Sequence, residues 1–304
     1  PLIQRENSGW NTEIFVQNTH ATQTGNVKLE FYQGATLVKS QTLTPLPPGA
    51  SVRVRQVEQT DLGERWVGSV RVTADVPVGA VVNEVHPDMV MAYSGFYGGV
   101  SRLAVPLVMT DTSGWFTGLQ VQNVGASAAP VTLRVNGRVV AEATIAPGSS
   151  QTWFPIPGTQ AGFVGSATVD GPAGSQLVAI VNQLHPDTGQ AMCYRGFGGG
   201  TRTLSAPLIM TDNNGWSTGL QVQNAGTQST TATLSIAGQA VETFTLAPGE
   251  SKTYFPVPGT QPGFVGAATI QGDVGAQLVG IVNEIYTRGD VPGELALAYE
   301  TINQ

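Results

Sequence analysis

Charged residues are scarce in this sequence. Asp, Glu, Lys and Arg make up only 12% of its 304 residues, about half of their usual share in soluble domains. The 14 basic residues include only three lysines and are outnumbered by 21 acidic residues, which gives a formal net charge of −7. Nucleic acids and anionic membrane surfaces are bound by a clustered basic face, so we expect neither as a partner.

Cysteine and long apolar runs are almost as rare. Cys193 is the single cysteine, which excludes an internal disulfide and a thiolate metal site. No apolar run approaches the roughly 20 residues that a membrane-spanning helix needs, so we expect no membrane span. The sequence starts at Pro1 without a charged and then apolar leader, which is expected either of a processed chain or of a fragment.

One stretch of ten residues is present three times. Each copy opens with Gly-Trp and closes on Val-Gln-Asn. The copies occupy residues 9–18, 114–123 and 215–224. Other marks recur in the same order, including a Pro-Gly pair and a Val-Asn pair. A period of about one hundred residues is the usual size of a domain with its own core. We therefore predict three homologous modules, at residues 1–104, 105–205 and 206–304.

The pattern within a module predicts an all-β fold. The second module shows short alternating or apolar runs separated by turn residues, and no useful helical period. The predicted strands are residues 104–109, 119–123, 131–135, 139–145, 150–154, 165–169, 176–184 and 190–194. Asn136-Gly137 predicts a type I′ hairpin turn, and Asp111 to Gly114 predicts a type I turn. Such short strands are typical of an antiparallel immunoglobulin-like sandwich, so we expect three in tandem.

The linkers between modules begin with glycines and end in strand-like runs, so the joints are expected to be shared strands. The first module has no such strand-like run before it, which predicts an unpaired sheet edge. One hypothesis is head-to-tail self-association, in which the segment around Pro1 and Ile3 docks with the segment from Ala298 to Gln304 of another copy. Such a contact would build a fibre. The alternative is that both ends are merely processing or fragment boundaries.

Comparison of the three repeats tests whether a candidate catalytic residue is present in every module. The acid position of Glu84 and Glu284 is Gln183 in the middle module, which excludes a catalytic carboxylate common to all three. His86 and His185 precede prolines in equivalent loops and are expected to be solvated turn residues. No Walker loop, GxSxG, HExxH or CxxC motif occurs. We expect no enzyme, and we assign no catalytic, cofactor-binding or metal-ligating residue.

Asparagine and tryptophan residues recur at equivalent positions of the three modules. Asparagines in the apolar strands are expected to bond neighbouring backbone, because a buried amide without partners costs roughly 1–3 kcal/mol. These asparagines are Asn83, Asn182 and Asn283. Each repeated tryptophan is expected to close its own sandwich, with a sugar-stacking platform as the alternative. These tryptophans are Trp10, Trp115 and Trp216.

Three further features stand outside the repeat pattern. Cys193 replaces alanines of the other modules and is expected to be a small core residue. Arg288-Gly289-Asp290 resembles the integrin-binding loop of fibronectin type III modules, although a three-residue match usually arises by chance. Two small, exposed runs, Ala-Ser-Ala-Ala-Pro at residues 126–130 and Thr-Gln-Ser-Thr-Thr-Ala-Thr at residues 227–233, could carry O-linked glycans.

The tandem modules resemble a known group of proteins. Gly-Trp-x-Thr-Gly-Leu-Gln-Val-Gln-Asn, Gly-Phe-Val-Gly-Ser-Ala, Ile-Val-Asn-Gln and a closing Ala-Tyr are similar to the immunoglobulin-like repeats of bacterial secreted and cell-surface proteins. The resemblance implies an extracellular, secreted or cell-surface location and a sandwich architecture. The first module departs from it at residues 53–58.

Two functions fit these observations best. The first is a non-enzymatic extracellular structural protein, the subunit of a filament or stalk assembled head to tail. The second is an adhesin or glycan-binding module of a bacterial surface protein. Low charge, repetition without a reactive site and strand-like linkers favour the first.

Overall fold

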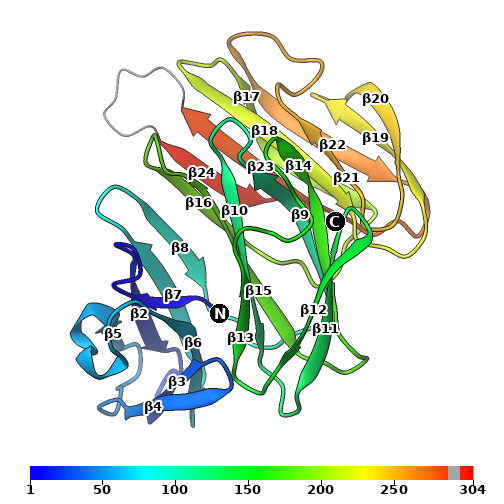
Figure 1. Ribbon diagram of the computed structural model, residues 1–304. Helices are drawn as coiled ribbons and strands as arrows, with labels where there is room; N and C mark the ends of the chain where they lie inside the picture. The colour runs from blue at the N-terminus through cyan, green and yellow to red at the C-terminus, as the bar shows by residue number, and fades with distance from the viewer. Residues whose placement is uncertain (287–294, 304) are drawn as a thin grey trace.

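The computed structural model describes residues 1–286 and 295–303, and over these ranges it is built almost entirely from antiparallel strands. The strands of these residues form six sheets, two for each module (Figure 1). The predicted all-β fold of tandem sandwiches is confirmed. The predicted module boundaries fall inside β9 (Arg102–Thr110) and β17 (Thr203–Thr211), so a continuous strand leads into each following module.

Module 1 has two four-stranded sheets, in the orders β1-β6-β3-β4 and β5-β2-β7-β8. The strands are β1 (Ile3–Arg5), β2 (Asn11–Asn18), β3 (Val27–Gln33), β4 (Thr36–Thr42), β5 (Ser51–Arg55), β6 (Trp66–Ala74), β7 (Val78–Val85) and β8 (Val90–Ser94). Two short 3-10 turns, η1 (Gln56–Glu58) and η2 (Thr60–Leu62), follow β5. They replace the Phe-Pro-x-Pro-Gly segment of the other modules.

Module 2 repeats this arrangement in the orders β12-β11-β14-β9 and β13-β10-β15-β16. In addition to β9, its strands are β10 (Phe116–Asn123), β11 (Ala129–Val135), β12 (Arg138–Ile145), β13 (Ser150–Trp153), β14 (Phe163–Asp170), β15 (Leu177–His185) and β16 (Gln190–Arg195). Each strand predicted from the sequence is present at nearly its predicted bounds. The strand with the most continuous apolar run, β15, lies inside its sheet as expected.

Module 3 has the sheets β20-β19-β22-β17-β25 and β21-β18-β23-β24. In addition to β17, its strands are β18 (Trp216–Asn224), β19 (Thr230–Ile236), β20 (Gln239–Leu246), β21 (Ser251–Tyr254), β22 (Phe264–Gly272), β23 (Leu278–Tyr286), β24 (Ala296–Glu300) and β25 (Ile302–Asn303). The short β25 pairs with Leu204 and Ser205 of β17, so this end of the chain adds a strand to its own module.

Tight turns set the register of the strands. Asn136 and Gly137 both have positive φ, 44° and 78°, as the predicted type I′ turn requires. The type I turn predicted at Asp111 to Gly114 is wrong. Ser113 and Gly114 have φ of 49° and 82°, and Thr112 exchanges two backbone hydrogen bonds with Trp115. A two-residue type I′ hairpin turn therefore directly precedes each tryptophan. The twist of this turn type matches that of the flanking strands.

The asparagine that closes each ten-residue repeat ties two loops to the sandwich. The Nδ2 of Asn123 donates to the carbonyls of Ser127 and Ile145, at 2.7 and 2.8 Å. Asn18 and Asn224 make the equivalent pairs of bonds in their own modules. These buried amides are satisfied by loop backbone, which explains why the repeats end on this residue.

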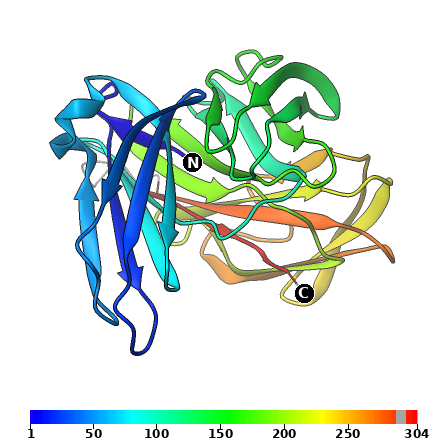
Figure 2. The same cartoon turned by 90° about the horizontal axis from the view of Figure 1, so that it is seen from below.

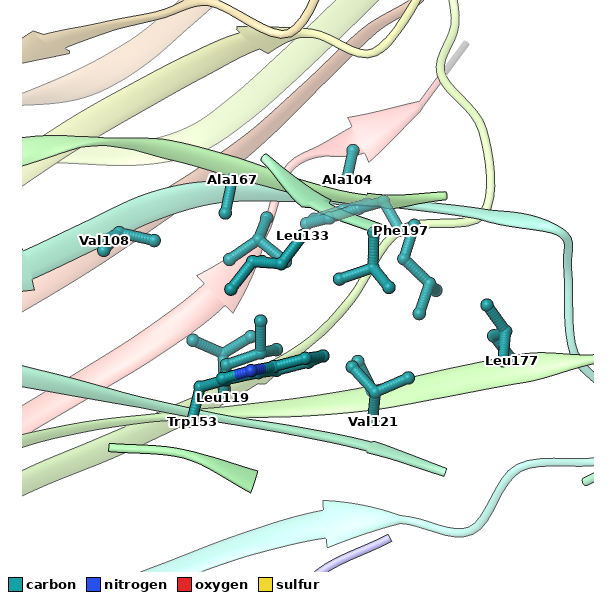
Figure 3. Close-up of a cluster of buried hydrophobic side chains, with 14 of the residues drawn as sticks. Ala104, Val108, Leu119, Val121, Leu133, Trp153, Ala167, Leu177 and Phe197 are labelled. Carbon is teal, nitrogen blue, oxygen red and sulfur yellow. The ribbon is translucent and has the colours of Figure 1, made fainter. Parts of the chain in front are cut away.

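The core of module 2 lies between its two sheets. Figure 3 shows Leu119, Val121 and Trp153 on one sheet facing Val108 and Leu133 on the other. The following apolar side chains of this core are no more than 8% exposed: Ala104, Val108, Leu119, Val121, Leu133, Trp153, Ala167, Leu177 and Phe197. This continuous apolar layer supplies the main stabilisation of the module.

The unpaired edge predicted for module 1 is present. In module 2, β9 pairs with β14 from Phe163 to Asp170. In module 1, the short β1 pairs only with residues 66–68 of β6. Among the described residues, no strand pairs with residues 70–73 on that side. The segments expected to join copies are already paired in their own modules, since Ile3 pairs with Gly68 and Ala298 with Asn283.

Candidate functional site at the module junctions

In modules 2 and 3, one sheet packs with its outer face against the open side of the preceding sandwich. Figures 1 and 2 show module 2, in green, in contact with module 1 in blue and cyan and with module 3 in yellow to red. Ile180 of β15 belongs to the hydrophobic cluster that forms the core of module 1. Val279 and Ile281 of β23 belong to the core cluster of module 2. Each core is thus completed by side chains from the next module.

The burial of equivalent positions shows what this docking does. Ile180 is 1% exposed and Ile281 is fully buried, although both point away from the core of their own module. Val81 occupies the same position in β7 of module 1, where no module packs against it, and it is 41% exposed. The contrast shows that the module contact, and not the sandwich itself, buries this face.

The same hydrogen bond anchors both junctions. The Ser69 hydroxyl donates to the carbonyl of Gly148 at 2.7 Å, across the first junction. The Ser166 hydroxyl donates to the carbonyl of Gly249 at 2.6 Å, across the second. These two carbonyls belong to the recurring Pro-Gly turns. The repeated sequence marks therefore encode a repeated contact between modules as well as a fold.

Glutamine side chains of the docked sheet add hydrogen bonds to each junction. The Nε2 of Gln120 donates to the carbonyls of Pro1 and Gly68, at 2.7 and 3.0 Å. The Nε2 of Gln223 donates to the carbonyl of Ala167 at 3.0 Å across the second junction. All of these bonds are buried, so a partner lost from them would leave an unsatisfied polar group at a cost of roughly 1–3 kcal/mol.

Two of the three recurring asparagines, Asn182 and Asn283, lie in these junctions, and for them the prediction that they bond neighbouring backbone is wrong. The Nδ2 of Asn182 donates to Oε2 of Glu84 in module 1 at 2.7 Å. The Nδ2 of Asn283 donates to Oε1 of Gln183 in module 2 at 2.9 Å. Each bond crosses about one hundred residues of sequence. A single module gives no sign of it, because the acceptor belongs to a different copy of the repeat.

Glu84 is the one carboxyl group buried in a junction among the described residues. Its side chain is completely buried, and Oε2 also accepts a hydrogen bond from Nε2 of Gln4 at 3.3 Å. Burial raises the pKa of Glu84 to about 7, against the opposing effects of Asn182, the Pro1 amine and Gln4. A protonated carboxyl group is thus favoured at this junction, and Gln183 supplies a permanently neutral side chain at the next one.

The strands β8, β16 and β24 run close together where the modules meet. Cys193 of β16 lies against Ala92 of β8, with Sγ 3.2 Å from the Ala92 carbonyl. It packs against the core cluster of module 1, so the expected small core residue is a junction residue. Burial raises the pKa of the Cys193 thiol to about 12, which keeps the thiol protonated and poorly nucleophilic.

Linker glycines fit closely against the following module. A Cβ on Gly99 would lie 2.4 Å from the carbonyl carbon of Gln176 and 2.5 Å from the nitrogen of Leu177. A Cβ on Gly200 would meet the equivalent backbone of Gln277 and Leu278. Val100 exchanges backbone hydrogen bonds with Leu177 immediately beyond. Only a residue without a side chain lets the linker approach this closely.

The Gly99→Ala substitution is expected to lower the free energy of unfolding by about 1–3 kcal/mol, because backbone atoms at the first junction must move to admit the methyl group. Urea denaturation measures this loss. Gly98→Ala is the matched control, since a Cβ there meets no atom within 4 Å and Gly98 does not have a left-handed φ. Equal losses for the two variants would contradict a close contact at Gly99.

The tryptophans and histidines pack together on their own modules. Trp10 and Trp115 are each 8% exposed, and their rings lie 5.2 and 5.3 Å from His86 and His185. Trp216 makes the equivalent ring contact with Tyr286. The tryptophans therefore close their sandwiches as predicted. The histidines are half-buried against the turns at Gly9 and Gly114, in contrast to the solvated turn residues that we expected.

The remaining candidate features add no second site. Within residues 1–286 and 295–303, no group of His, Cys, Asp and Glu side chains could hold a metal ion. No helix in the described part of the chain is long and apolar enough to cross a membrane. Arg288-Gly289-Asp290 lies outside the described residues. Cross-strand hydroxyl contacts join Thr231 to Thr245 and Thr233 to Thr243 on the surface of module 3.

Comparison with known proteins gives no family. No family model matches this chain, and no curated protein matches it. A solved structure of Thermotoga maritima 1070 shares 12% identity at a TM-score of 0.29, over 34% of this chain and 96% of the other. The central fibronectin-III array of RIM-binding protein shares 10% identity at a TM-score of 0.13, over 95% of this chain and 96% of the other. Likenesses this weak carry no functional argument.

Proposed function

We propose that this protein is a non-catalytic structural subunit of an extracellular or cell-surface assembly, in which copies pack head to tail. The observation that carries the proposal is the repeated junction, in which the outer sheet face of one module completes the core of the module before it. Low charge and the resemblance to surface repeats support the location. The proposal requires the same packing of a sheet face on a sandwich to continue between molecules, without the serine hydrogen bond, because Ala267 stands where Ser69 and Ser166 donate it.

Module 3 supports this by exposing the side on which a next module would pack. Leu297 is 56% exposed, whereas Met91 and Met192 at the equivalent positions are 4% and 2% exposed beneath the following module. Ala267 and Thr269 of β22 are exposed as well, and their equivalents in β14 are buried. Exposed side chains at positions that a neighbouring module otherwise buries favour a further module contact on this side.

Module 1 supports it from the other end. Val81 is exposed at the position of Ile180 and Ile281, and Phe15, half-buried with the Arg53 guanidinium over its ring, replaces Gln120. Asn83 occupies the position of Asn182, and Glu284 that of Glu84. An Asn83 side chain docked on a neighbouring molecule would therefore find a carboxyl acceptor, as Asn182 does within this chain.

The two surfaces differ, so their contact would be heterologous. A heterologous contact builds a ring if its rotation closes and an open filament if it does not. Trp10 and Trp115 are buried and Trp216 is half-buried, so they give no comparable support to glycan binding, since a sugar-stacking platform needs an exposed ring face. Sedimentation velocity over a wide concentration range, with negative-stain electron microscopy of the concentrated protein, tests the proposal.

The Leu297→Asp substitution is expected to weaken self-association by at least roughly tenfold, since a carboxylate would be buried where a neighbouring module packs. The fold of module 3 should be retained, because Leu297 is largely solvent-exposed. Val274→Asp is the matched control, since Val274 is 88% exposed in the loop before β23. Its equivalent, Ala173, stays exposed although module 3 packs nearby. A chain that remains monomeric at every concentration, or equal effects of the two variants, would overturn the proposal.

A further inference from the structure

We propose that a hollow at the second junction binds the carboxylate of an acidic sugar, such as a uronic acid. The hollow has a volume of about 400 Å³ and lies between the sheet that contains β9, β11 and β14 and the Pro248-Gly249 turn of module 3. Its charged wall consists of Arg102, Arg134 and Asp170. It lies apart from the surfaces proposed above for self-association.

Cross-strand pairing brings the three charged side chains together. Asp170 of β14 lies directly opposite Arg102 of β9, and Arg134 of β11 lies opposite Thr168, two residues before Asp170. The Nε of Arg134 donates to Oδ2 of Asp170 at 3.2 Å, and the Nε of Arg102 lies 3.5 Å from Oδ1. The carboxylate thus holds one guanidinium group at each of its oxygens, which positions both arginines.

The remaining nitrogens of both arginines are available to a ligand. Within the described chain, the Nη atoms of Arg102 and Arg134 donate to no protein acceptor. The two side chains are 35% and 39% exposed. A guanidinium group presents its donors as a planar fork that matches a carboxylate. Two such forks that line one hollow form a site for an anion.

The same hollow is lined by an unsatisfied hydroxyl group. Thr168 is 1% exposed, and its Oγ1 has no hydrogen-bond partner among the described residues. Buried polar atoms normally have such a partner, and a polar ligand in the hollow can supply it. The exposed Thr227 lies on the side of module 3. Hydroxyl groups from both modules give the hollow a lining that suits a ligand with hydroxyl groups of its own.

The charge of the wall selects among anions. Two arginines and one aspartate sum to a single positive charge, which a monoanionic carboxylate neutralises. A sulfate dianion would place an additional negative charge beside Asp170, which is unfavourable. Asp170 also accepts hydrogen bonds, and a sugar hydroxyl can donate one whereas sulfate cannot. A hydroxylated carboxylate therefore fits this wall better than an inorganic anion.

The repeats show that the junction contact does not need this cluster. The first junction has the same serine hydrogen bond as the second. Module 1 nevertheless carries Glu30 and Thr73 at the positions of Arg134 and Asp170. Module 3 carries Ser235 at the position of Arg134. The cluster is specific to module 2, so the packing of sandwiches does not account for it.

The test is a titration of the full chain with glucuronate at low salt, followed by saturation-transfer NMR of the sugar. We expect saturable binding, with the side-chain Nε–H signals of Arg102 and Arg134 shifting in the protein spectrum. Neutral glucose and sulfate should each bind at least roughly tenfold more weakly.

The double variant Arg102→Thr with Arg134→Ser should lose at least roughly tenfold in glucuronate affinity. It should keep its fold, because Thr203 and Ser235 occupy these positions in module 3. Arg138→Ser is the matched control, since Arg138 is exposed on β12 and makes no ion pair within the described residues. Its affinity for glucuronate should be unchanged.

The Asp170→Asn variant gives a readout that a purely structural role would not change. It raises the charge of the wall by one unit at nearly constant size, so sulfate affinity should rise at least roughly threefold. An unchanged sulfate affinity, equal glucuronate affinities of the native chain and the double variant, or a preference of the native chain for sulfate would overturn the proposal. None of these results would affect the head-to-tail proposal, which depends on other surfaces and is tested by sedimentation.

Discussion

The Ile180→Ala substitution is expected to lower the free energy of unfolding by about 2–4 kcal/mol, as for the truncation of a buried core side chain. This residue points away from the core of module 2, yet it is 1% exposed within the core cluster of module 1. The loss should therefore destabilise module 1 and its docking. We expect a single unfolding transition to separate into two, measured by urea denaturation and calorimetry.

Val81→Ala is the matched control for that result. Val81 occupies the equivalent position on the outer face of module 1, where it is 41% exposed and covered by no other module. Measured where the protein is monomeric, this variant should change the free energy of unfolding by less than about 0.5 kcal/mol. If both substitutions cost the same, or if Ile180→Ala costs nothing, the modules do not complete one another's cores.

Most of the sandwich could be predicted from the sequence because its determinants are local. Alternating apolar residues, Asn136-Gly137 and the recurring Pro-Gly pairs each act within a few residues, and they place the strands of module 2 almost correctly. The turn before Trp115 was predicted as the wrong type because Asp111 suggested a type I turn. The positive φ of Ser113 and Gly114 shows that the hairpin twist decides the conformation instead.

The junctions could not be predicted in the same way, because their partners are about one hundred residues apart. Asn182 was expected to bond backbone, and its partner is Glu84 of another module. The continuous apolar run of β15 suggested a central strand, which is correct, but it also reflects a second buried face. One signal was available in the sequence. The outward positions of β15 and β23 carry Val178 and Val279, where β7 has Gly79, so this position is apolar only in the docked modules.

The unpaired edge of module 1 could be predicted only in part. Its existence follows from the missing strand-like run, which a comparison of the repeats reveals. The cavity of about 410 Å³ beside this edge could not be predicted, because Gln122 and Val124 of module 2 line it together with residues of module 1. Local patterns thus predict which strands exist, and the repeated contact between modules decides which surfaces remain available.

Replacing Glu84 with glutamine is expected to stabilise the protein above about pH 7 and to leave its stability unchanged below about pH 4.5. The folded-state pKa of Glu84 is raised to about 7, whereas the unfolded chain has the ordinary value of 4.5. Neutral Glu84 therefore favours folding at low pH, and this contribution is lost as the pH rises towards 7. A shift of that size corresponds to about 3 kcal/mol for a completely buried group.

Gln183 supports the choice of substitution, because it occupies the equivalent position at the second junction and accepts the hydrogen bond of Asn283. The pH dependence of urea unfolding should be compared between the two proteins. The reciprocal variant Gln183→Glu should gain the pH dependence that Glu84→Gln loses. A stability difference that stays constant across this pH range would show that Glu84 is not buried in its neutral form, and the first junction would then need a different electrostatic account.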